Sequence, residues 1–318
     1  MGQRPHPAPA RPPEADQAGL SRSARGFETP TCLARGQRLD LRGVDYFIRQ
    51  TGQTRGPLLL LLHGLLDTGE SYAPLCHWLD DGWRIAAPDW RGHGDTGHAP
   101  AGYWFPDYVA DLDALCDQLS PEAPVAIIAH SMGTNIAALY AGLRPTRVQA
   151  LVCLDGLNVP HRRAEDVPSR YARWLKGQRR PRPERHYRSV AALARRVALR
   201  YPELDAERVR FLAHIWSRPV AQGVRLANDP DHLLPSPYGF DADAAMAVWR
   251  QTQARVFCLD GERSPARDWL SADLQQARRD VFPDSRHESL PGTGHFLHLE
   301  QPDTVAERIN PFLSAARS

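Results

Sequence analysis

The segment that most constrains the fold of this chain is a run of apolar residues that leads into a turn with a serine at its centre. Residues 125–129 are all apolar, Ser131 lies two positions later, and a helix-like pattern covers residues 135–143. A short apolar run before a longer helical pattern predicts a buried strand, a sharp turn and a helix. Such a turn strains the backbone of its central residue and needs small side chains two positions to either side, which Ala129 and Gly133 supply.

This turn would give the serine a chemical role. The strained backbone lifts the hydroxyl of Ser131 above the edge of the sheet. It also leaves the N–H of Met132 at the start of a helix, where it can donate to a developing oxyanion. We therefore interpret Ser131 as a nucleophile and Met132 as one oxyanion donor. The alternative is an ordinary connection between a strand and a helix that happens to contain a serine.

A nucleophilic serine needs a base, and one histidine near the C-terminus has the expected surroundings. Residues 290–296 read LPGTGHF, which is the end of a strand, a glycine-rich loop and then His295. The glycines allow the backbone to approach the sheet closely. The chain has 13 histidines, but this loop and the position after the serine in the chain distinguish His295. It is the predicted general base, and the alternative is a histidine of a surface loop.

Two further motifs each follow a predicted strand. Residues 58–62 are five consecutive leucines, typical of a strand that is buried on both faces, and they run into the sequence HGL at residues 63–65. The N–H of Leu65 is the predicted second oxyanion donor. A second buried strand at residues 84–88 opens the sequence DWRGHGDT at residues 89–96.

Together these motifs resemble the α/β-hydrolase superfamily. The sequences HGL, DWRGHGDT, HSMG and GTGHF occur in the order and at the spacings of that superfamily, and the resemblance covers residues 38–315. It implies an α/β fold with a mostly parallel, doubly wound sheet and an inserted helical cap. A serine rather than an aspartate at the turn excludes dehalogenase and epoxide hydrolase chemistry. It implies a serine hydrolase that forms an acyl-enzyme and requires no cofactor or metal.

Strand and helix patterns alternate along most of the chain, which favours a parallel sheet with helices on both faces. The predicted strands are an antiparallel hairpin over 38–42 and 46–50, then 58–62, 84–88, 124–129, 148–154, 255–260 and 286–290. The predicted helices are 71–80, 107–119, 132–143, 265–278 and 301–315. The alternation stops after residue 155 and resumes near residue 254. We therefore expect a disordered tail at 1–37, a core of 38–155 plus 251–318, and a helical cap at 156–250.

A serine–histidine pair also needs a carboxylate that orients the imidazole. In most α/β-hydrolases this acid follows the seventh strand in the pattern G-x-x-D, but here that position holds Ser264. The sixth strand ends in Asp155, and a carboxylate there is similar to the haloalkane-dehalogenase and serine-hydrolase-like branches. We assign Asp155 as the acid, with Glu262 and then Asp260 as the alternatives after the seventh strand. The remaining alternative is that Asp155 only caps the following turn.

Composition limits the partners of the chain. The formal net charge of +2 gives no global signal for nucleic acid, and no apolar stretch approaches the roughly 18 residues of a membrane helix. Residues 156–250 carry 18 Lys and Arg against 10 Asp and Glu. This excess indicates either an anionic substrate or simply solvated, arginine-rich helices. The five scattered cysteines favour a reducing compartment, so a cytoplasmic protein is predicted.

The predicted function is hydrolysis of a small-molecule acyl compound. We expect a carboxylic ester, a thioester or a lactone to react through an acyl-enzyme on Ser131. Carbon–carbon bond hydrolases, amide hydrolases and cofactor-free perhydrolases share this triad and stay as alternatives. Because the usual G-x-x-D acid is missing, a non-catalytic α/β-hydrolase fold that binds a ligand is a further alternative. The sequence leaves the substrate and the oligomeric state open.

Overall fold

The computed structural model describes residues 32–33, 36–99, 102–179 and 184–317. Of the predicted disordered tail, residues 1–31 and 34–35 lie outside this described part. Leu33 is fully buried, and its carbonyl accepts a hydrogen bond of 3.0 Å from the Arg49 guanidinium. The first strand begins at Gly36, so the predicted end of the tail at residue 37 falls inside that strand.

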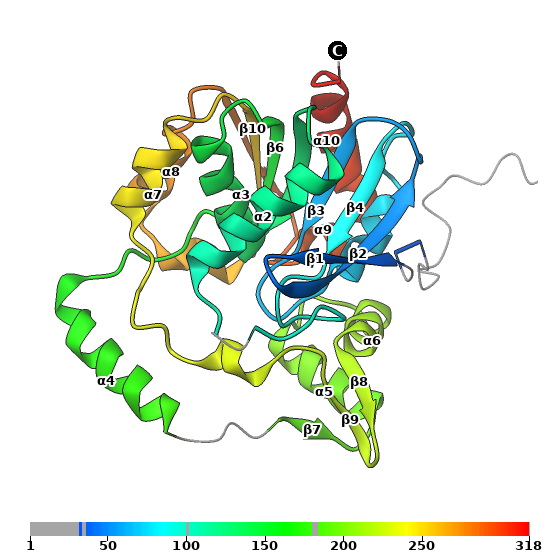
Figure 1. Ribbon diagram of the computed structural model, residues 1–318, viewed down its shortest axis with the longest axis vertical. Helices are drawn as coiled ribbons and strands as arrows, with labels where there is room; N and C mark the ends of the chain where they lie inside the picture. The colour runs from blue at the N-terminus through cyan, green and yellow to red at the C-terminus, as the bar shows by residue number, and fades with distance from the viewer. Residues whose placement is uncertain (1–31, 34–35, 100–101, 180–183, 318) are drawn as a thin grey trace, which may run out of the picture.

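Eight strands form one twisted sheet in the order β1-β2-β4-β3-β5-β6-β10-β11 (Figure 1). β1 and β2 form the predicted antiparallel hairpin, β2 pairs antiparallel with β4, and the other neighbours are parallel. The bounds are Gly36–Leu41 (β1), Val44–Gly52 (β2), Leu58–Leu62 (β3), Arg84–Pro88 (β4), Val125–His130 (β5), Val148–Leu154 (β6), Arg255–Gly261 (β10) and Ser285–Leu290 (β11).

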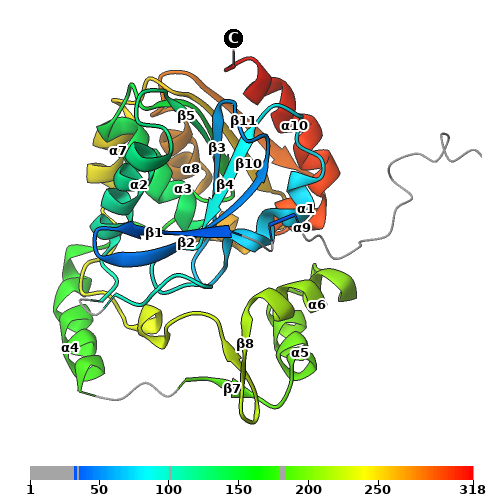
Figure 2. The same cartoon turned by 45° about the vertical axis from the view of Figure 1, so that its right-hand side comes forward.

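Two layers of helices cover the sheet, because successive side chains of each strand point to opposite faces. Leu58, Leu60 and Leu62 pack with the layer that contains α2, α3 and α7, whereas Leu59 and Leu61 pack with α1, α9 and α10. Figures 1 and 2 show α2 and α3 on one side of the sheet and α10 on the other. The helix bounds are Ala73–Cys76 (α1), Phe105–Leu119 (α2), Met132–Leu143 (α3), Ala242–Trp249 (α7), Ala272–Arg279 (α8), Leu297–Glu300 (α9) and Pro302–Ser314 (α10). The predicted mostly parallel sheet with helices on both faces is confirmed.

Two predicted helices are divided in the structure. The segment predicted at 265–278 is a 3₁₀ turn, Pro265–Trp269, followed by α8. The chain is extended at Leu270, and the hydroxyl of Ser271 accepts from the N–H of Leu274 to begin α8. The segment predicted at 71–80 is likewise a 3₁₀ turn, Gly69–Tyr72, that leads into the single turn of α1.

The inserted segment contains the expected helices and also a small sheet, which the sequence analysis does not predict. Besides α4 (Val167–Gln178), α5 (Val190–Arg200) and α6 (Ala206–Ile215), it contains a small antiparallel sheet in the order β7-β9-β8. Its strands are His186–Tyr187 (β7), Ser217–Val220 (β8) and Gly223–Leu226 (β9). β8 begins two residues after the end of α6, and a two-residue hairpin turn joins it to β9, where Gly223 has a φ of 107°.

The last helix of the predicted cap packs with the core. Ala245 and Trp249 of α7 are buried in the same apolar cluster as α3. The two helices approach closely, since a Cβ on Gly142 of α3 would lie 2.1 Å from the Val248 carbonyl oxygen. These contacts make α7 part of the core. The inserted segment is therefore residues 156–241, whereas the sequence analysis extends it to residue 250.

The inserted segment lies across the loops that follow the parallel strands (Figure 2). The indole N–H of Trp216 donates to Asp67 in the loop after β3, at 2.7 Å. Arg218 forms an ion pair of 2.7 Å with Asp95 in the loop after β4. The rings of Tyr201 and Phe296, the residue after His295, meet edge to face at 4.9 Å. The segment is therefore attached to the three loops that carry the motifs HGL, DWRGHGDT and GTGHF.

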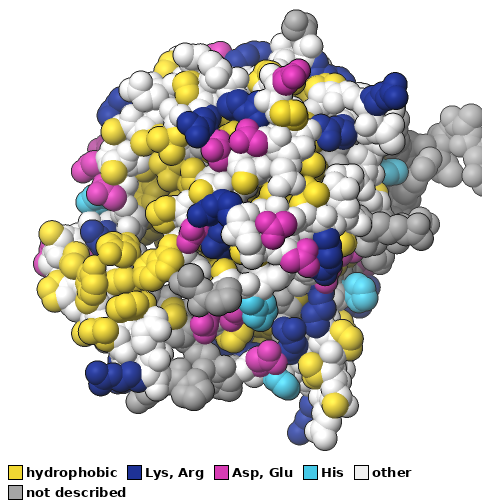
Figure 3. Space-filling view, viewed as in Figure 1, with side chains coloured by type: hydrophobic (Ala, Val, Ile, Leu, Met, Phe, Trp, Pro, Cys, Tyr) yellow, Lys and Arg dark blue, Asp and Glu magenta, His cyan; other side chains and the backbone are white. Residues whose placement is uncertain are grey.

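The helix α4 is different, because none of its residues is buried. It contacts the rest of the chain through aromatic rings: Trp174 lies 6.2 Å from Trp104, and Tyr171 lies 6.1 Å from Tyr238. Hydrophobic side chains gather on the molecular surface over this helix (Figure 3), and Tyr171, Leu175 and Tyr238 are exposed there.

A buried ion pair joins the hairpin, the loop after β4 and α2. Two hydrogen bonds of 2.6 and 2.7 Å connect the Arg91 guanidinium to the Asp111 carboxylate. These side chains are only 6% and 0% exposed. The Tyr46 hydroxyl also donates to Asp111, at 2.5 Å. Such a pair is costly to break because the partner that remains is a buried, uncompensated charge.

The substitution Asp111→Asn is expected to lower the free energy of unfolding by about 3–5 kcal/mol, since it leaves Arg91 buried without its main counter-charge. The matched control is Asp113→Asn on the same helix, which removes only a solvent-exposed ion pair with Arg144 and should leave stability almost unchanged. Urea unfolding of the two variants measures both effects. Equal losses in the two variants would contradict this account of the buried pair.

Candidate active site

Ser131 occupies the sharp turn between β5 and α3. Its backbone has φ 52° and ψ −115°, a region that non-glycine residues rarely adopt. The turn is tight on both sides: a Cβ on Gly133 would lie 2.3 Å from the Leu62 carbonyl oxygen, and one on Gly64 would lie 3.0 Å from the Ser131 Cβ. The strand, the turn and the helix thus have the geometry of the nucleophile elbow that the sequence pattern predicts.

Asp155 and His295 are in direct contact. The Oδ2 atom of Asp155 lies 2.5 Å from Nδ1 of His295. The carboxylate is fully buried, whereas the imidazole is 17% exposed. Asp155 follows β6 with a φ of 47°, so it too has a strained backbone at the end of a parallel strand. This contact leaves Nε2 as the ring nitrogen that can exchange a proton with another group.

Two further donors hold the Asp155 carboxylate. The hydroxyl of Ser264 donates to Oδ2 at 2.5 Å, and the N–H of Gly261 approaches Oδ1 at 3.3 Å. Ser264 is the residue at the position where the G-x-x-D pattern has its aspartate. The sequence reasoning treated it only as a missing acid and did not predict this hydrogen bond. The sequence did contain a signal for this contact, because the strands at 148–154 and 255–260 were both expected in one parallel sheet. In the structure these strands, β6 and β10, are parallel neighbours, so their ends lie side by side.

The two alternative acids have other partners. Glu262 is exposed and accepts a hydrogen bond of 2.9 Å from the N–H of Gly292. Asp260 lies 2.9 Å from the Arg279 guanidinium and 3.0 Å from Nε2 of His287. The His295 ring has Asp155 as its carboxylate neighbour.

Ser131 and His295 lie at the same edge of the sheet. His130, the residue before the serine, has its ring 4.6 Å from the ring of His295, and its Nε2 lies 2.8 Å from the His295 carbonyl oxygen. Within the part of the chain that the structure describes, no hydrogen bond is formed between the Ser131 hydroxyl and the His295 ring. Catalytic hydrogen bonds are often long in ligand-free sites and shorten when substrate binds.

The two predicted oxyanion donors follow β3 and β5. Met132 is the first residue of α3, where helix geometry provides no intrahelical acceptor for its N–H. Leu65 lies in the turn after β3 and is 49% exposed. The next amide, that of Leu66, donates to Nε2 of His93 at 3.1 Å. β3 and β5 are parallel neighbours, so these two loops begin at the same edge of the sheet.

Two buried histidines brace the loops after β3 and β4. His63 Nε2 accepts from the N–H of Trp90 at 2.9 Å, so the proton is on Nδ1, which donates to the Gly64 carbonyl at 2.7 Å. Burial lowers the pKa of His63 to about 3 and holds the pKa of His93 well below its usual value. Both imidazoles are therefore neutral hydrogen-bonding groups near pH 7, as expected for residues that support the site.

Comparison with known proteins agrees with this architecture. The chain matches the family described as "alpha/beta hydrolase fold" over residues 57–302. It is 25% identical over 279 residues to the 2-(acetamidomethylene)succinate hydrolase of Mesorhizobium japonicum, covering 88% of this chain and 95% of the relative. It is 28% identical to a serine hydrolase-like protein of Danio rerio, covering 82% and 83% of the two chains.

A solved structure from Pseudomonas aeruginosa PAO1, a hypothetical protein, superposes with a TM-score of 0.78 at 26% identity and covers 88% of this chain and 99% of its own. In the part that the structure describes, no helix is long and apolar enough to cross a membrane. The family match spans well over half of the sequence and includes the turn at Ser131 and the loop at His295. The chain therefore belongs to the α/β-hydrolase fold family, and it is a hydrolase of that fold.

Proposed function

We propose that this hydrolase cleaves a carboxylic ester, a thioester or a lactone through an acyl-enzyme on Ser131. The observation that carries the proposal is the contact of 2.5 Å between His295 and the buried Asp155 beside a serine with a strained backbone. A strained nucleophile, a histidine and an orienting carboxylate are the three parts of a serine hydrolase triad.

The proposed reaction has two halves. The Ser131 oxygen attacks the substrate carbonyl carbon while Nε2 of His295 takes its proton, and the N–H groups of Leu65 and Met132 donate to the resulting oxyanion. His295 then gives the proton to the leaving alcohol or thiol, and the acyl-enzyme forms. A water molecule attacks the acyl group by the same steps, which releases the acid and restores the serine hydroxyl.

The role proposed for Asp155 is to hold the His295 ring with the proton on Nδ1. A carboxylate can only accept this proton donation, so Nε2 is left as the base. The charge of Asp155 also stabilises the imidazolium formed during the reaction. Ser264 is a positioning residue in this scheme, because its hydrogen bond fixes the carboxylate that orients the histidine.

A second candidate is hydrolysis of an amide or a carbon–carbon bond by the same residues. It is favoured by the relative named 2-(acetamidomethylene)succinate hydrolase, whose substrate name contains an acetamido group and a dicarboxylate. Assays of purified protein with p-nitrophenyl acyl esters of graded length, beside amide and 1,3-diketone substrates, separate these reactions. The ester proposal requires the highest kcat/KM for one of the esters.

The substitution Ser131→Ala is expected to abolish covalent labelling by a fluorophosphonate probe and to lower kcat by a factor of about 10³ or more, because no other group can form the acyl-enzyme. Mass spectrometry of the labelled protein and ester assays measure the two effects. Labelling that persists in the variant would identify another nucleophile. A wild-type protein that is never labelled would instead support a non-catalytic ligand-binding fold.

The substitution Asp155→Asn should preserve the fold and lower kcat by a factor of about 10²–10⁴, because an amide in this position favours the wrong tautomer of His295. Glu262→Gln is the matched control, since Glu262 contacts the Gly292 amide and not the imidazole. Its kcat should stay near the wild-type value. The opposite ranking of the two variants would return the acid to the loop after β10.

We also propose that residues 156–241 act as a cap that controls entry to the site. The support is its attachment to the loops after β3 and β4 and to the His295 loop. Labelling of Ser131 with a bulky fluorophosphonate should slow amide hydrogen exchange in this segment, because the adduct would lie beneath it. Exchange that changes only outside residues 156–241 would contradict the proposal.

A further inference from the structure

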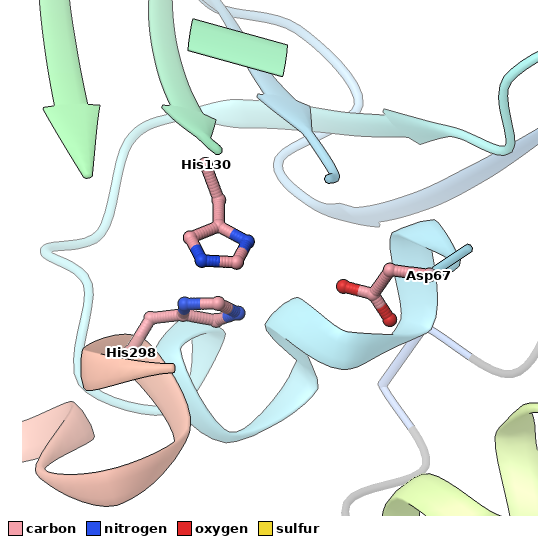
Figure 4. Close-up of side chains that lie close together, drawn as sticks. All are labelled: Asp67, His130 and His298. Carbon is pink, nitrogen blue, oxygen red and sulfur yellow. The ribbon is translucent and has the colours of Figure 1, made fainter. Parts of the chain in front are cut away.

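Three buried side chains converge behind the His295 loop. Asp67 follows β3, His130 ends β5, and His298 belongs to α9. One ligand atom of each lies within 4.8 Å of the others, and all three residues are at most 2% exposed. Figure 4 shows the two imidazole rings beside one another, with the Asp67 carboxylate facing them from one side. None of the three has a role in the proposed reaction.

His130 has one ring nitrogen that no other group shares. Its Nε2 lies 2.8 Å from the His295 carbonyl oxygen, and a carbonyl can only accept, so Nε2 carries the proton. Nδ1 is then deprotonated and bears a lone pair. This atom is buried and has no hydrogen-bond partner within the described residues. A histidine whose second nitrogen donates to a backbone carbonyl is the usual arrangement of a metal ligand.

His298 is more unusual, because neither of its ring nitrogens has a partner in the described part of the chain, although the residue is fully buried. Its ring stacks on Tyr72 with centroids 4.8 Å apart, which fixes its plane. Leaving a buried polar group without a partner is costly, so such a group requires an explanation.

Asp67 supplies an oriented negative charge. The Trp216 indole donates to Oδ1 and the Ser71 hydroxyl donates to Oδ2, both at 2.7 Å. Both donors are neutral, and Asp67 forms no ion pair with another described residue. A buried carboxylate without a neighbouring cation is costly.

We propose that Asp67, His130 and His298 form a binding site for a divalent transition-metal ion, with Zn²⁺ as the best-matched ion. Two neutral imidazoles and one carboxylate are ligands that Zn²⁺ prefers, with a solvent molecule as the fourth ligand. Metal–ligand distances of about 2.0–2.2 Å require the three atoms to lie closer together than 4.8 Å, so the side chains would have to move toward one another when the ion binds. The other occupant that fits unpartnered nitrogens is a buried water molecule.

An ion in this site would join the loop after β3, the end of β5 and the helix after the His295 loop. Because it binds the folded chain only, Zn²⁺ should raise the melting temperature of metal-free protein, and the rise should grow with the logarithm of the zinc concentration above the dissociation constant. This outcome depends on folding and not on turnover, so it is independent of the proposed esterase reaction.

The test uses full-length protein stripped of metal with a chelator. Titration calorimetry with Zn²⁺ should show one site, and Co²⁺ in its place should give visible absorption bands of a nitrogen- and oxygen-ligated ion. His298→Gln and Asp67→Asn should each weaken Zn²⁺ binding by about 100-fold or more, since loss of even a supporting residue costs 10–100-fold. The control is His161→Ala, which removes a histidine from the exposed cluster of His161, Asp241 and Asp243.

A Zn²⁺-soaked crystal of the wild-type chain makes the test independent of how the variants fold. An anomalous peak between Asp67, His130 and His298 supports the proposal. A water molecule in that position with no anomalous signal, or zinc found only at other residues, overturns it. Zinc affinity that is unchanged in His298→Gln but lost in His161→Ala overturns it as well.

Discussion

The rest of the structure depends on one close approach, that of α3 to the end of β3. The chain can turn from β5 into α3 at Ser131 only because Gly133 lies against the Leu62 carbonyl, where no Cβ would fit. The strain at Ser131 is compatible with a stable fold because β5 is buried along its whole length and most of α3 is buried as well. The packed centre of the sheet thus fixes the backbone of the turn.

Around that turn the polar groups form layers that run from the buried interior toward solvent. His63 and His93, neutral and buried, hold the loops after β3 and β4 through backbone hydrogen bonds. Asp155 is held by Ser264 and Gly261 before it meets His295. The partly exposed His295 ring is the member of this network nearest to solvent. The partly exposed imidazole is therefore held in position by buried groups.

Local sequence signals predicted most of the core and much of the candidate site. The bounds of β3, β4, β6 and α3 agree with the predictions, because consecutive apolar residues and helix periodicity act within one element. The site motifs could be placed from the sequence as well, because each of them directly follows a predicted strand. The hydrogen bond from Ser264 to Asp155 was missed, since it joins residues 109 positions apart. The hairpin of β8 and β9 and the packing of α7 on α3 were missed too, because both depend on tertiary contacts.

The carboxylate beside His295 comes from the loop after β6, and this affects how freely the loop after β10 can vary among chains of this fold. With Asp155 at the end of β6, the loop after β10 supplies a neutral hydroxyl instead of a charge. A neutral supporting group is easier to replace than an orienting carboxylate, so this loop is less constrained than in relatives that carry the acid there. Family signatures keyed to an aspartate after β10 would pass over such chains, although the spatial arrangement around the histidine is retained.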